Sequence, residues 1–263
     1  MTSLIQGNSL EAMKGMKSNS VDLIVTSPPY ADRRKNTYGG VTAEKYCAWF
    51  MPFASEMRRV LKETGSLFLN IKPHTKDGER ELYVFELVIA MKRQAGFRFV
   101  DEFSWTRLGV PGKFKGRFKN AFEPVYHFSK TGEYTFNPMA VASPAKEVSL
   151  ARYKRKACGN SQNGSGFGGM RKEITATMAL PSNVLNIPQK SNQHTAQKKH
   201  PAVFPVELSD FFVKAFSDEG GVVLDPFMGS GTVGVSCKKL NRKFIGIDSM
   251  PEYVELAKER IGT

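Results

Sequence analysis

The feature that most restricts the fold of this chain is a strand that ends in an acid and runs into a glycine loop. The apolar stretch VVLD, Val222 to Asp225, is followed by PFMGSGT and a helical pattern, and a second strand pattern ends in Asp248. Glycines allow a ligand to approach the backbone, and an acid at the end of the next strand suits two ribose hydroxyls. The order predicts a nucleotide-binding crevice, with a purely structural glycine turn as the alternative.

Strand and helix patterns alternate along most of the chain. The sequence predicts strands over residues 21–26, 66–71, 97–105, 124–129, 222–224 and 244–247, and helices over 43–61, 82–91, 206–216, 231–240 and 251–261. This alternation favours an α/β fold with a mostly parallel sheet and helices on both faces.

A second motif, SPPY at Ser27 to Tyr30, follows the buried strand pattern VDLIVT. The two prolines fix the backbone, so that a carbonyl and the Ser27 hydroxyl can accept hydrogen bonds from an exocyclic amine. Tyr30 can offer a stacking face to the same flat ring. A proline-rich turn with a packed tyrosine is the alternative for this motif taken alone.

The charge of the chain is strongly positive and unevenly distributed. Lys and Arg number 38 against 25 Asp and Glu, and residues 141–200 hold ten of the basic residues against two acids, a net of +8. Such a bias in a folded protein indicates a polyanionic partner, with nucleic acid ahead of an anionic membrane surface.

The cysteines and the N-terminal residues indicate a cytoplasmic protein. Cys47, Cys158 and Cys237 are widely spaced and form no CxxC pattern, so neither a disulfide framework nor a zinc site is expected. The first residues carry no secretory signal pattern, and no run of about 18 apolar residues occurs. We expect no membrane association and no metal.

Together, SPPY and DPFMGSGT resemble the amino-methylating DNA methyltransferases, which transfer a methyl group from S-adenosylmethionine to cytosine N4 or adenine N6. The order of catalytic motif, basic region and cofactor loop is similar to the permuted beta class. The resemblance covers nearly the whole chain. GNSLE at 7–11 matches the segment that contacts the adenine of the cofactor, and HPAVFP at 200–205 matches the segment that flanks the methionine part of the cofactor. Asn8 replaces the more frequent Asp, and its amide oxygen still suits an adenine amine.

The resemblance implies a fold and a set of site residues. The fold is a seven-stranded Rossmann-like sheet with one antiparallel strand and a basic target-recognition insert. The implied divisions are a catalytic half at 1–137, the insert at 138–198 and a cofactor-binding half at 199–263. The catalytic residues are Ser27, Pro28, Pro29 and Tyr30, and the cofactor-binding residues are Asn8, Phe204, Asp225, Pro226, Phe227, Gly229, Ser230, Gly231, Thr232 and Asp248.

Transfer to an amine nitrogen is an in-line displacement that needs positioning and electrostatics, not a covalent nucleophile. C5-cytosine enzymes use a cysteine next to a proline, and none of the three cysteines follows a proline. The target amine lies inside a duplex, so the base must be flipped out. Ser in the first position of SPPY is similar to many N4-cytosine enzymes, whereas N6-adenine enzymes more often carry Asp; we expect N4-cytosine, with N6-adenine as the alternative.

Double-stranded DNA is the expected partner, with a cognate restriction endonuclease as a second candidate. The basic residues expected to contact DNA follow the SPPY loop or lie in the insert; for the first group a solvated charge run is the alternative. They are Arg33, Arg34, Lys35, Arg152, Lys154, Arg155, Lys156, Arg171 and Lys172.

Rival functions include the same chemistry on RNA or protein and a catalytically silent DNA-binding regulator. Intact motifs argue against the regulator. The chain lacks the glycine pattern of a nicotinamide oxidoreductase and the lysine of a Walker loop.

Glu123 before Pro124 resembles a polar position near the active site of some relatives, with a capping or surface role as the alternative.

Overall fold

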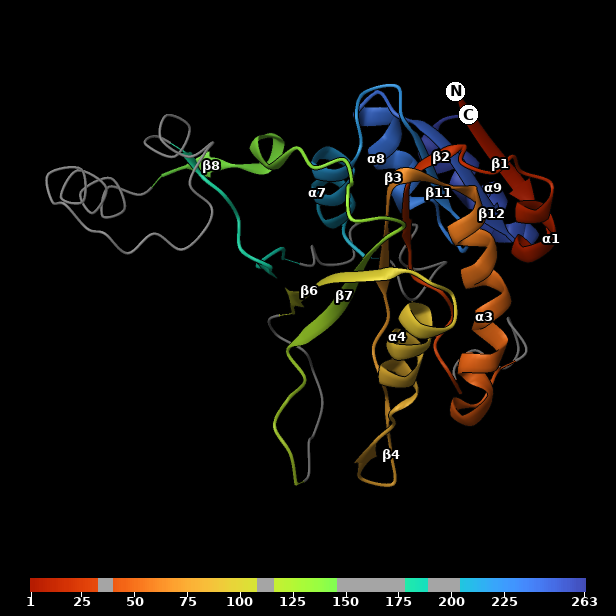
Figure 1. Cartoon of the computed structure of the whole chain (residues 1–263), viewed down its shortest axis with the longest axis vertical. Helices are drawn as coiled ribbons and strands as arrows, with labels where there is room; N and C mark the ends of the chain where they lie inside the picture. Colours follow the sequence, from red (N-terminus) through yellow and green to blue (C-terminus); the bar gives the residue numbers. More distant parts are fainter. Residues whose placement is uncertain (33–39, 108–115, 146–177, 189–203) are drawn as a thin grey trace, which may run out of the picture.

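The computed structural model describes residues 1–32, 40–107, 116–145, 178–188 and 204–263. Within these ranges one large sheet has the strand order β1-β12-β11-β2-β3-β7-β6-β10 (Figure 1). Its strands are β1 (Thr2–Gln6), β2 (Val21–Thr26), β3 (Leu61–Asn70), β6 (Arg98–Thr106), β7 (Phe122–Ser129), β10 (Val184–Leu185), β11 (Val222–Asp225) and β12 (Lys243–Asp248).

The pairing of the strands confirms the predicted sheet. β7 pairs antiparallel with both β3 and β6, and every other pairing in this sheet is parallel. Seven of the strands form the expected sheet with one antiparallel member. The two-residue β10 adds an eighth strand beside β6.

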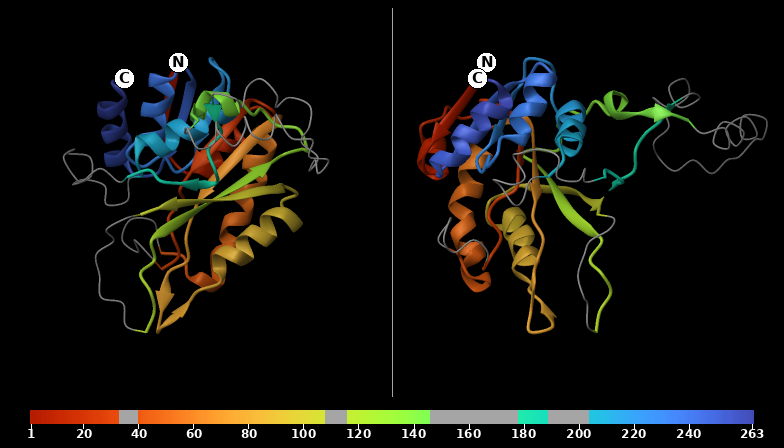
Figure 2. Two further views of the ribbon diagram at one scale, coloured as in Figure 1. Left: turned by 90° about the vertical axis from the view of Figure 1, so that its left-hand side faces the viewer. Right: turned by 180° about the vertical axis from the view of Figure 1, so that it is seen from behind.

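Helices cover both faces of the sheet, as the alternating patterns predict (Figure 2). On one face lie α1 (Ser9–Lys14), α3 (Ala43–Val60) and α4 (Tyr83–Arg93), and on the other α7 (Val206–Phe216), α8 (Thr232–Lys239) and α9 (Pro251–Ile261). Successive strand residues point to opposite faces. Ile24 and Leu67 therefore pack in the first layer, while Leu23 and Phe68 pack in the second.

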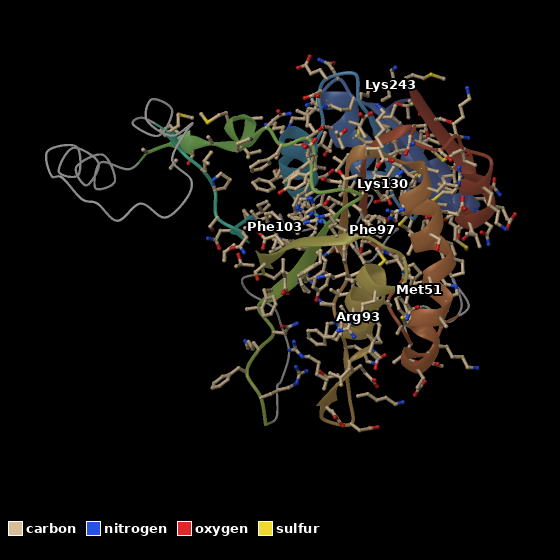
Figure 3. All side chains as sticks on the ribbon, viewed as in Figure 1. Met51, Arg93, Phe97, Phe103, Lys130 and Lys243 are labelled. Atoms are coloured by element: carbon tan, nitrogen blue, oxygen red, sulfur yellow. The ribbon has the colours of Figure 1, made fainter. Side chains whose placement is uncertain are left out.

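Both faces of the central strands are buried, which explains their continuous apolar runs. In β2 only Asp22 is not fully buried. Phe97, directly before β6, and Phe103, within it, belong to the apolar clusters on opposite faces (Figure 3). The sheet is thus a rigid support for whatever its strand ends carry.

Two elements at the N-terminus mix polar and apolar residues, and the sequence did not predict them. β1 is five residues long and lies at the edge of the sheet, paired with β12. α1 has six residues, and Asn8 caps it by accepting hydrogen bonds from the backbone N–H groups of Leu10 and Glu11. They bring the N-terminus beside the C-terminal half of the chain (Figure 1).

A small hairpin extends below the sheet edge on which β3 ends. It consists of β4 (Thr75–Lys76) and β5 (Glu79–Arg80), joined by Asp77 and Gly78, which both have positive φ angles of 49° and 87°. An Asp-Gly pair with two positive φ angles is a preferred two-residue hairpin connection. The hairpin fixes the position of Arg80, which pairs with Thr75.

The expected insert contributes only short elements among the described residues. They are the 3₁₀ helix η1 (Pro138–Val141) and the paired strands β8 (Ser143–Pro144) and β9 (Met178–Ala179), which project away from the large sheet (Figures 1 and 2). Because β10 joins the large sheet, all three predicted divisions supply strands to it. The division boundaries stay a prediction.

Within the ranges that the structure covers, no helix is long and apolar enough to span a membrane.

Candidate active site

The two motifs meet at the carboxyl ends of neighbouring strands. β2, which leads into SPPY, pairs in parallel with β11, which leads into the glycine loop. At the ends of these strands the Thr26 hydroxyl donates a buried hydrogen bond of 2.7 Å to the Asp225 carboxylate. The edge formed by the carboxyl ends of parallel strands is where α/β proteins bind ligands. Segments that are 199 residues apart in the chain therefore form one site.

Backbone hydrogen bonds and close packing fix the glycine loop. Met228 N–H donates to the carbonyl of Ile247, and Gly231 N–H donates to the carbonyl of Met228. Gly231 has a φ of +75°, and a Cβ at this position would lie 2.8 Å from the Cβ of Ala257 in α9. Only glycine meets both requirements.

Asp248, at the end of β12, holds this loop in place. Its two carboxylate oxygens accept hydrogen bonds from the backbone N–H groups of Gly229 and Met250, both at 2.9 Å, and the residue is only 2% exposed. The predicted acid thus lies beside the predicted glycines. Its role toward ribose hydroxyls stays a prediction.

Asp225 is a buried acid with an unusual protonation equilibrium. Burial, at 2% exposure, raises its pKa from 3.8 to about 7, and the nearby Asp248 adds to the rise. Hydrogen bonds from the Thr26 hydroxyl and the Phe227 N–H act in the opposite direction. A carboxyl group in this state can gain a full negative charge when a cation approaches.

The GNS segment at the N-terminus lies against the same loop. Gly7 N–H donates to the carbonyl of Asp248, and the Ser9 hydroxyl donates to the carbonyl of Pro226. A Cβ at Gly7 would meet no atom within 4 Å, so the space beside it is open. The Asn8 amide oxygen caps α1, and its predicted contact with a cofactor adenine stays a prediction.

The remaining predicted cofactor residues also surround this loop. Phe227 packs against the α3 rings of Trp49, Phe50 and Phe53, with centroid distances of 5.4 to 6.3 Å. The hydroxyls of Ser230 and Thr232 accept hydrogen bonds from Arg260 of α9. The half-buried Phe204 contacts the cluster on the α7 and α8 face.

The SPPY loop turns its last residue toward a cavity. Pro28 is buried, and the carbonyl of Pro29 accepts a 2.7 Å hydrogen bond from the Tyr46 hydroxyl of α3. The side chain of Ser27 is hydrogen-bonded with the phenol of Tyr30. Burial and the nearby Glu123 raise the pKa of that phenol strongly, so Tyr30 remains neutral.

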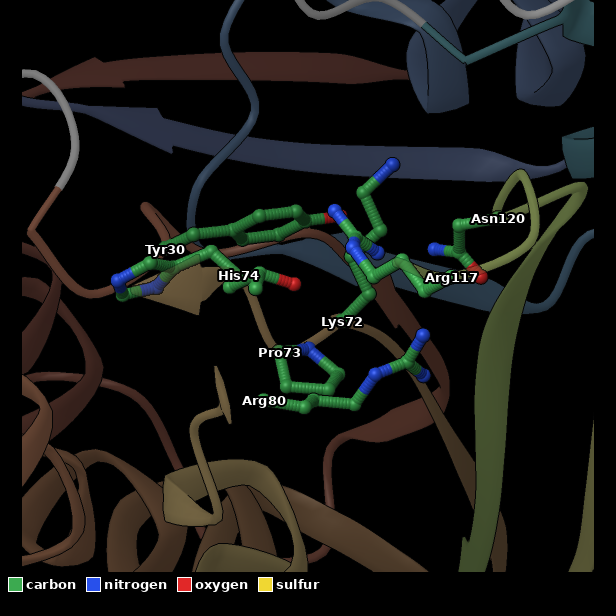
Figure 4. A pocket seen from close by; sticks show the side chains of 8 residues that line it. Tyr30, Lys72, Pro73, His74, Arg80, Arg117 and Asn120 are labelled. Carbon is green, nitrogen blue, oxygen red and sulfur yellow. The ribbon is translucent and has the colours of Figure 1, made fainter. Parts of the chain in front are cut away.

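The cavity beside Tyr30 has a volume of about 320 Å³ and mostly basic polar walls (Figure 4). Its walls come from three separate segments: the SPPY loop, the chain from β3 through the β4–β5 hairpin, and the residues before β7. The lining residues are Tyr30, Lys72, Pro73, His74, Thr75, Arg80, Arg117 and Asn120.

One buried acid organises the basic side of this cavity. Glu123, at 6% exposure, pairs with Lys72 at the end of β3 and with Arg107 at the end of β6. Its burial contradicts the surface alternative, and its ion pair with Lys72 places it next to the cavity that Tyr30 lines. Its role in an active site stays a prediction. The two cations, Lys72 and Arg107, hold the Glu123 carboxylate in one orientation.

Sequence reasoning missed the basic wall residues Lys72, Arg80 and Arg117, together with Asn120. A signal was available for Lys72, because it follows the strand pattern 66–71 and the carboxyl ends of parallel strands share one edge. The other three residues lie on a hairpin and a loop without any pattern.

The nine residues predicted to contact DNA lie outside the described residues. They are Arg33, Arg34, Lys35, Arg152, Lys154, Arg155, Lys156, Arg171 and Lys172. Among the described residues, no group of His, Cys, Asp or Glu side chains is placed to hold a metal ion.

Comparison with known proteins gives consistent matches over the whole chain. A family model described as DNA methylase matches residues 21–259. The chain is 30% identical to the Type II methyltransferase M.PvuII of Proteus hauseri, over 96% of this chain and 81% of that protein. It is 28% identical to the DNA adenine methyltransferase YhdJ of Escherichia coli strain K12, over 98% and 82%. The solved PvuII DNA methyltransferase, cytosine-N4-specific, superposes with a TM-score of 0.76 at 26% identity, covering 98% of this chain and 86% of that one.

Proposed function

The chain belongs to the DNA methylase family of N6 and N4 amino methyltransferases, and we propose that it methylates the exocyclic N4 amine of a cytosine that is flipped out of duplex DNA. The methyl donor is S-adenosylmethionine. The observation that carries the proposal is the bond between Thr26 and Asp225, because it joins the SPPY loop to the glycine loop. A donor on one loop and a base on the other would lie in contact.

The residues around the glycine loop fit a cationic donor with a nucleoside end. Asp225 is a buried carboxyl that a positive charge would ionise, and the aromatic ring of Phe227 offers an apolar wall beside it. The open space at Gly7 lies at the ends of β1 and β12, where a nucleoside end would extend. When bound, the donor supplies an electrophilic methyl group on a sulfonium.

On the base side, the residues hold the acceptor amine. The Ser27 hydroxyl and a backbone carbonyl of the SPPY loop accept hydrogen bonds from the two amine hydrogens, which aims the nitrogen lone pair outward. Tyr30, neutral at all physiological pH values, stacks on the ring. Ser27 and the SPPY carbonyl would thus hold the nitrogen in line with the donor's methyl carbon. The nitrogen–carbon bond would form as the thioether leaves, and the proton of the methylated amine would pass to water.

Cytosine is favoured over adenine by Ser27. A serine hydroxyl provides one acceptor here, whereas the Asp that is frequent in N6-adenine enzymes provides a carboxylate. The cytosine-N4 specificity of the PvuII enzyme supports this choice. The relative YhdJ, a DNA adenine methyltransferase at 28% identity, supports N6-adenine as the second candidate.

M.PvuII is a Type II methyltransferase, which supports a role in restriction and modification, with a cognate endonuclease as a partner. M.BamHII of Bacillus amyloliquefaciens, 30% identical over 94% of this chain, is an orphan methyltransferase and supports a role without one. Both roles use the same reaction on double-stranded DNA.

The test is incubation of the purified chain with S-adenosylmethionine and DNA from a host that lacks its own methyltransferases, followed by nucleoside mass spectrometry. We expect N4-methylcytosine. N6-methyladenine would reverse the choice of base but keep the reaction. RNA tested in parallel distinguishes the substrates, and Tyr30→Ala is the matched control for contaminating activity. DNA binding without either product would establish the silent regulator instead.

A further inference from the structure

Phe118 is the most exposed aromatic side chain among the described residues. It is 98% exposed and lies in the segment between β6 and β7, at residues 116–121. A single exposed apolar residue needs no explanation by itself. What distinguishes Phe118 is the position of its neighbours relative to the cavity beside Tyr30.

Two residues of the same segment line that cavity. Arg117 and Asn120 turn their side chains into the space that Tyr30, Lys72 and Arg80 also line (Figure 4). Phe118 is not part of the lining, so its ring stands in solvent beside the cavity. It is flanked in the chain by two basic residues, Arg117 and Lys119.

The exposed apolar residues near α4 lack this setting. Leu82, Phe85 and Ile89, at 47% to 59% exposure, follow one face of α4 and line no part of the cavity. An aromatic ring between two cations beside a basic cavity fits a partner that offers phosphates and flat bases together. DNA has both.

A base that leaves the duplex for the cavity leaves a gap in the stack. Proteins that unstack DNA often insert an apolar side chain to fill such a gap, because the ring replaces part of the lost stacking. We infer that Phe118 enters the duplex at the position vacated by the flipped base, while Tyr30 holds that base in the cavity. This inference rests on the proposed function. Arg117 and Lys119 would then contact the phosphates on either side of the gap.

The test compares Phe118→Ala with the unmodified chain on two synthetic duplexes that carry the methylated site, once sequencing has mapped it. In one duplex the target base is paired, and in the other it lies opposite an abasic position. We expect kcat/KM on the paired duplex to fall by about 10-fold in Phe118→Ala. The loss should largely disappear on the abasic duplex, because the target base there is already unpaired.

Two further variants serve as controls. Phe118→Leu keeps an apolar side chain and should retain most of the rate on the paired duplex. Phe85→Ala removes an exposed ring from α4 and should leave both rates unchanged. S-adenosylmethionine affinity, measured by calorimetry, should be equal in all four proteins.

An equal loss on both duplexes would show that Phe118 contributes general DNA affinity and not gap filling, and an unchanged rate on the paired duplex would remove it from the reaction. Either result overturns the inference while the methyltransferase proposal stands. No methyl transfer by the unmodified chain on any DNA would instead overturn the proposed function, and the inference with it.

Discussion

The two halves of the site are built by different means. Around the glycine loop, the acids Asp225 and Asp248 are buried at 2% exposure, and each accepts a hydrogen bond from the backbone of the loop. Around Tyr30, side chains pair with one another, as Lys72 and Arg107 do with Glu123, and several remain in contact with solvent. One half is shaped by backbone geometry and the other by side-chain charge.

This difference has consequences for how each half responds to change. A buried acid that organises a loop cannot be removed without leaving buried donors unpaired, which costs stability. An exposed basic side chain can be removed with little structural effect, because surface charges contribute little to folding. We therefore expect changes in the glycine-loop half to affect folding and the methyl donor together, and changes at Tyr30 and the exposed basic residues of its half to affect DNA alone.

The largest effect is expected for Asp225→Ala. The change leaves the Thr26 hydroxyl and the Phe227 N–H without their common acceptor, so the free energy of unfolding should fall by about 2 kcal/mol. S-adenosylmethionine affinity should fall by about 100-fold, since the charge and the loop geometry are lost together. Urea unfolding and calorimetry measure the two losses. Asp225→Asn keeps one side-chain carbonyl oxygen as an acceptor. If it lost as much stability and as much S-adenosylmethionine affinity as Asp225→Ala, the charge alone would account for both losses.

The raised pKa of Asp225 gives the second effect. Below pH 7 the carboxyl of the donor-free chain is protonated and neutral, so S-adenosylmethionine affinity should fall by up to about 10-fold per pH unit as the pH decreases from 7. Stability changes in the opposite sense. The folded chain binds the proton more tightly than the unfolded chain, so the free energy of unfolding should decrease as the pH rises from about 4 to about 7.

Asp225→Asn should abolish both pH dependences, and it isolates them from other titrating groups. Calorimetric titrations from pH 5.5 to 8 and urea unfolding at the same pH values test this point. If the variant and the unmodified chain showed parallel curves, Asp225 would not be the titrating group.

Tyr30 gives the third effect, confined to DNA. Tyr30→Ala should reduce turnover on duplex DNA by about 10-fold through the loss of stacking on the flipped base. Tyr30→Phe keeps the ring and should retain most of the rate, although the hydrogen bond with Ser27 is lost. Donor affinity should not change in either variant. Normal turnover in Tyr30→Ala would remove the stacking proposal.

The same two halves differ in how far the sequence could predict them. The glycine loop and Asp248 form a contiguous pattern, in which each strand ends in the residue that the site uses, and the structure places them together. The basic wall of the cavity joins Lys72, Arg80 and Arg117 from three segments. Their proximity depends on how β3, β7 and the β4–β5 hairpin are arranged in space, and no local spacing records that arrangement.

The fold shows the same division between long and short patterns. The helices α3, α4 and α7 and the strands β2 and β11 carry long or fully apolar patterns, and the predictions for them were confirmed within a few residues. The apolar run of β3 was also predicted, but the strand begins at Leu61, directly after α3, and not at residue 66. β1 and α1 mix polar and apolar residues without an apolar run, and β10 has only two residues. They form because the rest of the fold presents a partner, such as β12 for β1.

The smallest expected effect is a change in the salt dependence of DNA affinity, which should occur in the Tyr30 half and not in the glycine-loop half. Arg80 is exposed and forms no ion pair with any acid in the described part of the chain, so Arg80→Gln should leave folding unchanged. If it contacts one phosphate, the slope of log affinity for DNA against log salt should become shallower by about 1, and affinity should fall a few-fold.

Lys92→Gln, at an exposed position near the end of α4, removes the same charge away from the cavity and should not alter the slope. Arg155→Gln and Arg171→Gln, in the basic insert, should behave like Arg80→Gln. Fluorescence anisotropy over a series of NaCl concentrations measures each slope, and an equal slope in Arg80→Gln and the unmodified chain would place this residue off the DNA interface. Donor affinity should change little with salt in every variant, because the acids of the glycine-loop half are buried and screened weakly by ions.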